Sequence, residues 1–432
     1  MKIYKYTDLS KQNIEELCLR QLADDASIAK SVKAIIGKVK SAGDQALRDY
    51  ALQFDKVNLD QLFLTKDEIA QIASEIPDDA RAAIDTAYAN IKKFHAAQIS
   101  QEAKVETMPG VSCWREARAI ARVGLYIPGG TAVLPSTFLM LGIPAILAGC
   151  QEIVVCSPPQ QNGKTNCFLA YCAQLLGIEK IYLAGGAQAI AAMAFGTESV
   201  PEVYKIFGPG NRYVTQAKQQ VLASGITAID MPAGPSEVLV IADETASPAF
   251  VAADLLAQAE HGTDSQAILI ANSAALITET LQQIELQLSE LPRKDIAAQA
   301  IVNSYAVLVE NMTQAMAFSN AYAPEHLILA TDHYEELIPQ IINAGSVFLG
   351  NLTPESAGDY ASGTNHTLPT SGFAKAYSGV SIDSFIKKIT FQHISPQGLT
   401  AIGPTVEILA AAEGLQAHKN AITIRLKSSD GY

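Results

Sequence analysis

Apolar and polar positions change their spacing near residue 119, and this change separates two kinds of predicted structure. Residues 1 to about 110 carry apolar side chains at helical spacing, which predicts amphipathic helices. One of them, Asp78 to Gln98, contains His95 among lysines, so His95 is predicted to lie on a solvated face. From Ala119 onwards, short apolar runs alternate with helical patterns, which is typical of an α/β fold.

The alternating region divides into two successive series of strands. The first series is predicted at 123–126, 152–156, 180–184 and 203–207. The second is predicted at 237–241, 267–271, 305–310, 327–330 and 346–349. Helices between the strands favour two doubly wound α/β units with parallel sheets.

The last part of the chain lacks this alternation. Residues Thr353 to Ser381 are rich in Gly, Ser and Thr, and so long a loop in a compact protein is usually functional. A helix is then predicted from Pro404 to Asn420, followed by a strand-like segment from Ala421 to Leu426.

Composition narrows the class of protein. The 432 residues suffice for two or three domains, and 49% hydrophobic with 17% charged residues indicates a globular protein. A net charge of −13 argues against nucleic acid as a partner. The first residues lack the apolar core of a signal peptide, and no run of about 18 apolar residues suggests a membrane span. We therefore expect a cytoplasmic protein whose six cysteines, which form no CxxC pair, are reduced.

Candidate metal chemistry lies in the predicted helix Ser247 to Gly262. Ser247 can cap its start, and Gly262 suits a left-handed stop at its end. Gln258 and His261 are three positions apart, so they project from one face near the end of the helix. An imidazole beside a carboxamide oxygen can bind a metal. Taken alone, a histidine that only bonds the last carbonyls of its helix is the more common case.

A second candidate pair is Glu325 and His326, which directly precede a predicted buried strand. Histidine suits a general base near neutral pH, and glutamate can activate a water or hold the imidazole. The alternative is a solvated surface turn whose geometry is set by Pro324.

Three glycine turns follow predicted strands and open helices, at Gly129-Gly130, Gly185-Gly186 and Gly208-Pro-Gly210. Backbone amides at such helix starts favour phosphates, although glycine turns needed only for topology are as common. No GxGxxG motif is present, and Asn162-Gly-Lys-Thr165 is no P-loop because Pro158 replaces its first glycine.

Several motifs together resemble the histidinol dehydrogenase family over nearly the whole chain. They are Tyr126–Gly130, Gly185–Gln188, Phe207–Asn211, Ile229–Glu237, Gln258–His261, Tyr322–His326 and Glu413–His418, in this order. The resemblance implies two-step oxidation of L-histidinol to L-histidine through the aldehyde, using two NAD and one water, as the last step of histidine biosynthesis. It also implies two Rossmann-like units with helical N-terminal and C-terminal extensions. The expected boundaries are an extension at 1–24, a metal-binding unit at 25–126 plus 236–375, an NAD unit at 127–235 and a tail at 376–432.

The resemblance also implies residue roles. Zinc is bound by Gln258, His261, Asp359 and His418, His326 is the general base, and Glu325 activates water. Substrate contacts come from the four ligands and His326 and, in addition, from Ser236, His366 and Glu413. NAD contacts come from Tyr126, Gln188 and Asn211. The family forms intertwined homodimers, so His418 and Glu413 are expected to complete the site of the other chain.

Two other functions remain open from the residues themselves. A zinc hydrolase could use the same ligands and the Glu325–His326 pair to activate water. A two-lobed binding protein would show no turnover. Reduction of NAD in the presence of L-histidinol separates both from a dehydrogenase.

Overall fold

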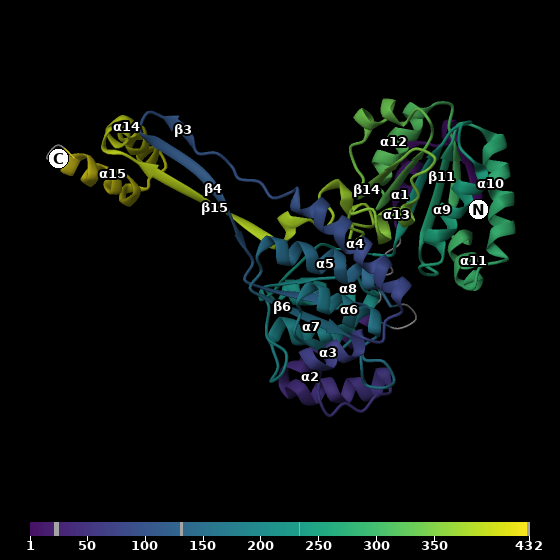
Figure 1. Cartoon of the computed structure of the whole chain (residues 1–432). Helices are drawn as coiled ribbons and strands as arrows, with labels where there is room; N and C mark the ends of the chain where they lie inside the picture. Colours follow the sequence, from purple (N-terminus) through teal and green to yellow (C-terminus); the bar gives the residue numbers. More distant parts are fainter. Residues whose placement is uncertain (21–25, 130–132, 233, 430–432) are drawn as a thin grey trace. The chain divides into compact units, whose positions relative to one another are not determined.

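The computed structural model describes residues 1–20, 26–129, 133–232 and 234–429 (Figure 1). It contains two compact units, one formed by Met1–Gln98 with Ile120–Phe385 and the other by Ile99–Ala119 with Ile386–Tyr432. None of the described helices has the length and apolar character needed to cross a membrane.

The first unit contains two parallel sheets, and sheet 1 corresponds to the first predicted series. Its strand order is β2-β7-β6-β5-β8-β9, with only β2 antiparallel to its neighbour. The strands are β2 (Phe63–Leu64), β5 (Arg122–Tyr126), β6 (Glu152–Ser157), β7 (Ile181–Leu183), β8 (Lys205–Phe207) and β9 (Ala228–Ile229). The helices between them are α5 (Pro135–Ala148), α6 (Cys167–Leu176), α7 (Gly186–Phe195) and α8 (Arg212–Ala223).

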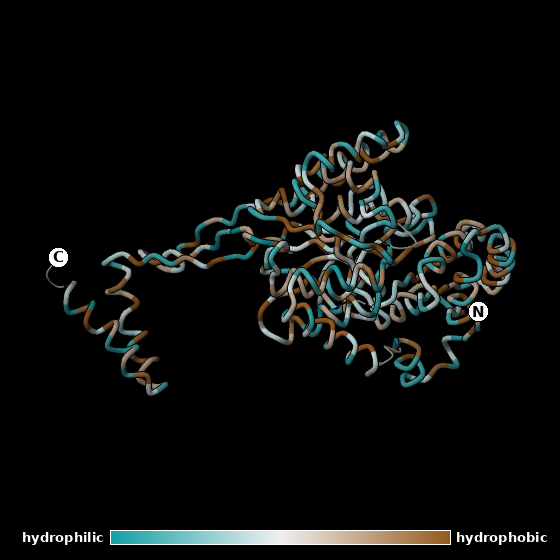
Figure 2. Tube along the Cα trace, turned by 90° about the horizontal axis from the view of Figure 1, so that it is seen from below, coloured by the Kyte–Doolittle hydropathy of each residue, from teal (hydrophilic) through white to brown (hydrophobic). Residues whose placement is uncertain are grey.

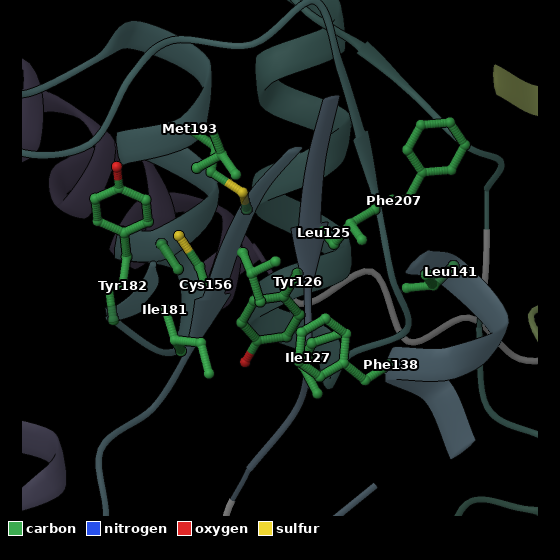
Figure 3. Close-up of a cluster of buried hydrophobic side chains, with 14 of the residues drawn as sticks. Leu125, Tyr126, Ile127, Phe138, Leu141, Cys156, Ile181, Tyr182, Met193 and Phe207 are labelled. Atoms are coloured by element: carbon green, nitrogen blue, oxygen red, sulfur yellow. The ribbon is translucent and has the colours of Figure 1, made fainter. Parts of the chain in front are cut away.

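The core of sheet 1 draws side chains from strands and helices alike. Figure 3 shows part of it, where Leu125, Cys156 and Ile181 of the strands lie near Phe138 and Met193 of α5 and α7. Three N-terminal helices add their apolar faces to the same core: α2 (Ala26–Tyr50), α3 (Lys66–Ala73) and α4 (Asp78–Ala96). Residues 26–96 thus pack on sheet 1, whereas the expected boundaries placed 25–126 in the unit of the other sheet.

The predicted solvated position of His95 in α4 is wrong. Its side chain is fully buried, and Nδ1 lies 2.9 Å from the carbonyl oxygen of Ile91 one turn earlier. Ile91 is itself in the core, so the ring continues the buried face of the helix. The neighbouring Lys92 and Lys93 had suggested exposure, and both are exposed, but the His95 ring itself lies on the buried side of α4.

Sheet 2 corresponds to the second predicted series. Its order is β1-β12-β11-β10-β13-β14, and all neighbouring strands are parallel. The strands are β1 (Lys2–Lys5), β10 (Glu237–Ala242), β11 (Gln266–Ala271), β12 (Tyr305–Leu308), β13 (His326–Ala330) and β14 (Ser346–Leu349). Its helices are α1 (Lys11–Cys18), α9 (Pro248–Ala259), α10 (Ala274–Leu288), α11 (Lys294–Val302), α12 (Met312–Tyr322) and α13 (Glu355–Tyr360). Figure 1 shows α9, α10 and α11 beside β11.

The two sheets arrange their strands in the same order. In each, the first strand of the α/β series is central, strands two and three lie on one side, and strands four and five lie on the other. This order is that of doubly wound folds, and it confirms the predicted α/β class.

The second unit contains a sheet that the sequence analysis did not predict. β4 (Val111–Ala119) pairs antiparallel with β15 (Ile386–Ile394) and with β3 (Val105–Met108). Helices α14 (Pro396–Ala412) and α15 (Gln416–Ser429) follow, and Figure 2 shows brown hydrophobic positions along both. The strand-like prediction for Ala421–Leu426 is wrong, because these residues lie inside α15 and pack it against α14.

Candidate active site

The amino ends of two neighbouring strands bring acidic and basic side chains together. Glu237 begins β10 and His326 begins β13, and Val238 is in register with His326. Parallel strands start at the same edge of a sheet, so residues 89 positions apart become neighbours. This edge is opposite to the carboxyl edge at which doubly wound folds usually bind ligands.

His326 is held in a defined orientation by the backbone. Its ring is buried, and Nδ1 donates to the carbonyl oxygen of Glu237 at 3.2 Å. Nε2 is therefore the nitrogen that can accept a proton whenever the ring is neutral; it has no hydrogen-bond partner and lies 3.4 Å from Oδ1 of Asp359. Burial by itself lowers the pKa of His326, but the charges of Glu355, Glu325 and Asp359 outweigh burial and raise it well above its usual value.

Glu325 is fixed beside the imidazole. Its Oε2 accepts a hydrogen bond from the backbone N–H of Glu237 at 2.9 Å and lies 3.7 Å from Nδ1 of His326. Burial raises the pKa of Glu325 to about 8, and the neighbouring His326 acts against this shift. The predicted alternative of a solvated turn is wrong, because both side chains are buried.

A buried ion pair between Arg20 and Glu237 lies next to Glu325 and His326. Arg20 donates to both carboxylate oxygens of Glu237 at 2.7 and 2.8 Å, and its guanidinium lies 3.4 Å from the ring centroid of Tyr322. The same carboxylate accepts hydrogen bonds from the backbone N–H of Glu325 at 3.3 Å and of Ser371 at 3.2 Å. Arg20 therefore fixes the backbone from which Glu325 and His326 project.

Glu237 belongs to one of the sequence motifs but has no predicted role of its own, and Arg20 has no predicted role at all. A signal for Glu237 was available, because it is the only charged residue of the apolar strand Glu237–Ala242 and stands at its start. No pattern in the sequence marks Arg20, which pairs with a residue 217 positions away.

Gln258 has the environment of a metal ligand. Its side chain is fully buried in the last turn of α9, and neither amide atom has a hydrogen-bond partner. A buried carboxamide without a partner is costly, which indicates that another group completes its coordination.

Three further side chains lie close enough to share one metal ion. One ligand atom from each of His261, Glu355 and Asp359 lies within 4.8 Å of the others. Loss of solvation lowers the pKa of His261, although the residue keeps exposed surface, so its imidazole is neutral and able to bind a metal. A set of imidazole nitrogen, carboxylate oxygen and carboxamide oxygen atoms fits zinc. Among the described residues of α9, only Gln258 has a buried side-chain oxygen without a hydrogen-bond partner.

The end of α9 differs from the prediction. The helix stops at Ala259, Glu260 caps it in a right-handed conformation, and Ser247 makes no side-chain cap bond at its start. Gly262 is therefore no left-handed stop. His261 lies just beyond the helix, where its N–H bonds the carbonyl of Gln258 at 3.3 Å.

Glu355 is a site residue that the sequence analysis missed. It lies four positions before Asp359 on α13, which places both carboxylates on one helix face. Its Oε1 is 3.6 Å from Nδ1 of His326, and its Oε2 is buried without a partner. Burial raises the pKa of Glu355 to about 8, and His326 acts in the opposite direction. The four-residue spacing to Asp359 was the signal that could have found it.

The remaining predicted substrate residues are in different places. His366 lies in the long loop, with Nε2 2.8 Å from the hydroxyl of Thr137 on α5, and Ser236 directly precedes Glu237. Glu413 and His418 belong to the second unit, at the end of α14 and in α15, and both are exposed.

The three predicted NAD residues line one cavity of about 1290 Å³ at the carboxyl edge of sheet 1. Tyr126 ends β5, and its hydroxyl accepts a hydrogen bond from the N–H of Gly186 at 3.0 Å. Gln188 is buried in the first turn of α7, and Asn211 caps α8 through its Oδ1. Gly130, part of a predicted glycine turn, lies outside the described residues. The volume is sufficient for a dinucleotide.

Comparison with known proteins gives consistent matches over the chain. The family model described as histidinol dehydrogenase matches residues 18–426. A histidinol dehydrogenase of Bacteroides thetaiotaomicron is 57% identical over 99% of both chains, and a chloroplastic one of Arabidopsis thaliana is 51% identical over 99% of this chain and 92% of its own.

A solved structure agrees with the fold. The crystal structure of histidinol dehydrogenase from Elizabethkingia anophelis superimposes with a TM-score of 0.96 at 52% identity, covering 100% of this chain and 99% of the other. These matches do not support the zinc hydrolase alternative. The chain belongs to the histidinol dehydrogenase family.

Proposed function

We propose that this chain oxidises L-histidinol to L-histidine in two successive hydride transfers to NAD. The observation that carries the proposal is the buried His326, whose Nε2 lies 3.4 Å from Asp359, a member of the cluster of His261, Glu355 and Asp359. A general base beside a metal-binding cluster can hold an alcohol and remove its proton. Family membership supports the choice of L-histidinol as the alcohol.

His326 is the proposed base for the first oxidation. Because Nδ1 donates to the carbonyl of Glu237, the ring cannot rotate freely, and Nε2 is the nitrogen that accepts the hydroxyl proton.

The proposed zinc ligands in this chain are Gln258, His261 and Asp359, with His418 as the fourth. When bound, zinc supplies positive charge that positions the substrate and offsets the negative charge of Asp359 beside His326.

Glu325 is the proposed base for hydration of the aldehyde. It lies beside His326 and is held by the N–H of Glu237, so it can take a proton from water next to the reacting carbon. A carboxylate accepts that proton only when it is ionised, and the neighbouring His326 opposes the effect of burial and favours the ionised form. Ser236, His366 and Glu413 are proposed substrate contacts, and Tyr126, Gln188 and Asn211 are proposed NAD contacts.

Metal analysis with an activity assay tests the proposed function. The purified chain is expected to contain zinc and to reduce NAD when L-histidinol is added. Hydrolysis of an ester or amide without NAD reduction would favour the hydrolase instead.

The two half-reactions should respond differently to Glu325→Gln. Water enters only when the aldehyde is hydrated, so the variant should lose more activity with L-histidinal than with L-histidinol, by roughly 10-fold or more. Single-turnover NADH formation from each substrate measures the two steps separately. Equal losses would instead assign Glu325 to the orientation of His326.

The cysteines are expected to be dispensable. Burial raises the pKa of Cys150 to about 11, so its thiol stays protonated and is a poor nucleophile for an aldehyde. Cys113 lies on β4 in the second unit. We expect Cys113→Ala and Cys150→Ala each to keep aldehyde oxidation within about twofold of the unmodified chain. Selective loss of aldehyde oxidation in either variant would indicate a thiohemiacetal.

We also propose that two chains assemble as an intertwined homodimer. The second unit exposes large apolar side chains, with Ile408 70% and Ile424 64% exposed. Such surfaces on a small unit favour burial against another chain. In this assembly, Glu413 and His418 of each chain complete the site of the other.

A further inference from the structure

The cavity at the carboxyl edge of sheet 1 contains one carboxylate that the proposed function does not use. Asp55 ends the short π-helical segment Ala51–Asp55 and lines the cavity. It is the only charged side chain among the described lining residues, because every other member of that lining is polar or apolar. The cavity therefore carries negative charge and offers no Lys or Arg from the described part of the chain.

One oxygen of this carboxylate lacks a partner. Oδ2 of Asp55 is buried and makes no hydrogen bond. Burial raises the pKa of Asp55 to about 6, which still leaves most of the carboxylate ionised at pH 7. The carboxylate of Asp55 lines the cavity, so a bound molecule that supplies an O–H or N–H to it would be stabilised there.

Asp55 acts on Tyr126, which contacts the start of α7. Burial raises the pKa of Tyr126 to about 12, and the nearby charge of Asp55 adds to this effect, so the two side chains are within electrostatic reach. Tyr126 in turn accepts the N–H of Gly186 at the start of α7. Asp55, Tyr126 and Gly186 all line the same cavity, so a dinucleotide bound there would pass close to Asp55.

The usual source of a ribose-binding acid is missing from this sheet. Many dinucleotide-binding folds place Asp or Glu after the second strand, where it bonds the ribose hydroxyls and distinguishes NAD from NADP. Here β6 runs into Ser157-Pro158-Pro159, which has no carboxylate. Asp55 supplies one to the same cavity from outside the sheet.

We propose that Asp55 accepts a hydrogen bond from a ribose hydroxyl of NAD and thereby excludes dinucleotides that carry a 2′-phosphate. A phosphate at this position would meet a negative carboxylate with no cation among the described lining residues to compensate it. The inference rests on the proposed function, in which NAD occupies this cavity.

Steady-state kinetics of Asp55→Asn test the inference. Asparagine has the same shape but cannot act as an anionic acceptor. We expect the KM for NAD to rise roughly 10- to 100-fold with kcat within about twofold, since a hydrogen bond to a charged group is lost from binding alone. The preference for NAD over NADP, as a ratio of kcat/KM values, should fall at least about 10-fold because the repulsion is removed.

Asp60→Asn is the matched control, because Asp60 is an exposed carboxylate five residues later. It should leave the KM values for both dinucleotides unchanged, and thermal unfolding should show that both variants are folded. An unchanged KM for NAD in Asp55→Asn would overturn the inference. A raised KM with an unchanged NAD preference would also overturn it, because Asp55 would then contact another part of NAD.

A third variant separates this inference from the proposed function. Gln188→Leu removes a buried polar side chain from the same cavity. If it raises the KM for NAD while Asp55→Asn does not, NAD occupies the cavity and only the role of Asp55 is wrong. If neither variant changes the KM for NAD, NAD binds elsewhere, and both the inference and the proposed NAD contacts fail, whereas loss of the proposed function itself would appear as no NADH formed from L-histidinol.

Discussion

Replacement of His326 by Asn is expected to lower the turnover of L-histidinol by roughly 10²–10⁴-fold while zinc stays bound. The carbonyl of Glu237 accepts a hydrogen bond from Nδ1 of His326, and the side-chain amide of asparagine can still donate to it. Asparagine offers no basic nitrogen at the position of Nε2. The loss should appear in kcat, because proton removal belongs to the chemical step. Zinc per chain is measured on the same preparation.

His333→Asn is the control for this variant. His333 is exposed in the turn after β13, so its replacement should leave kcat and zinc content unchanged. If His326→Asn loses its zinc, His326 is a ligand and not the base. If the variant keeps both zinc and turnover, another group removes the hydroxyl proton.

Two inactive variants should restore activity to each other when their chains exchange. His261→Ala removes a proposed ligand from the first unit, and His418→Ala removes the proposed fourth ligand from the second. If the second unit of each chain completes the site of its partner, a mixed dimer has one site with both substitutions and one site with neither. Random pairing makes about half the dimers mixed, so roughly a quarter of the original activity should return.

The exchange itself needs an independent measurement. Chains with different affinity tags, purified through both tags in turn, give the fraction of mixed dimers. Each variant re-associated with itself is the control and should stay inactive. No recovered activity in a preparation with confirmed mixed dimers would show that His418 serves its own chain or is no ligand.

The two parallel sheets could be predicted because their signals are local. Strands buried on both faces appear as apolar runs, and the helices between them have caps and glycine stops, such as the Asn166 cap and the Gly177 stop of α6. The predicted bounds of β10 and β14 accordingly agree with the structure to within one residue.

Other features depend on partners far away in the sequence. β4 pairs with β15, beginning at Ala119 opposite Ile386, and its sequence has no regular alternation that would mark it as a strand. His95 was misassigned because polar neighbours hid its position on the buried face of α4. Arg20 has no predicted role because its partner Glu237 lies 217 positions away, whereas Glu355 could have been found from its four-residue spacing to Asp359.

The stoichiometry of NADH formation tests the proposed function most directly. With limiting L-histidinol and excess NAD, the chain is expected to form two NADH for each L-histidinol consumed, and L-histidine should be the product. This ratio requires both hydride transfers and the hydration step. One NADH with accumulation of the aldehyde, or no NADH at all, would contradict the account.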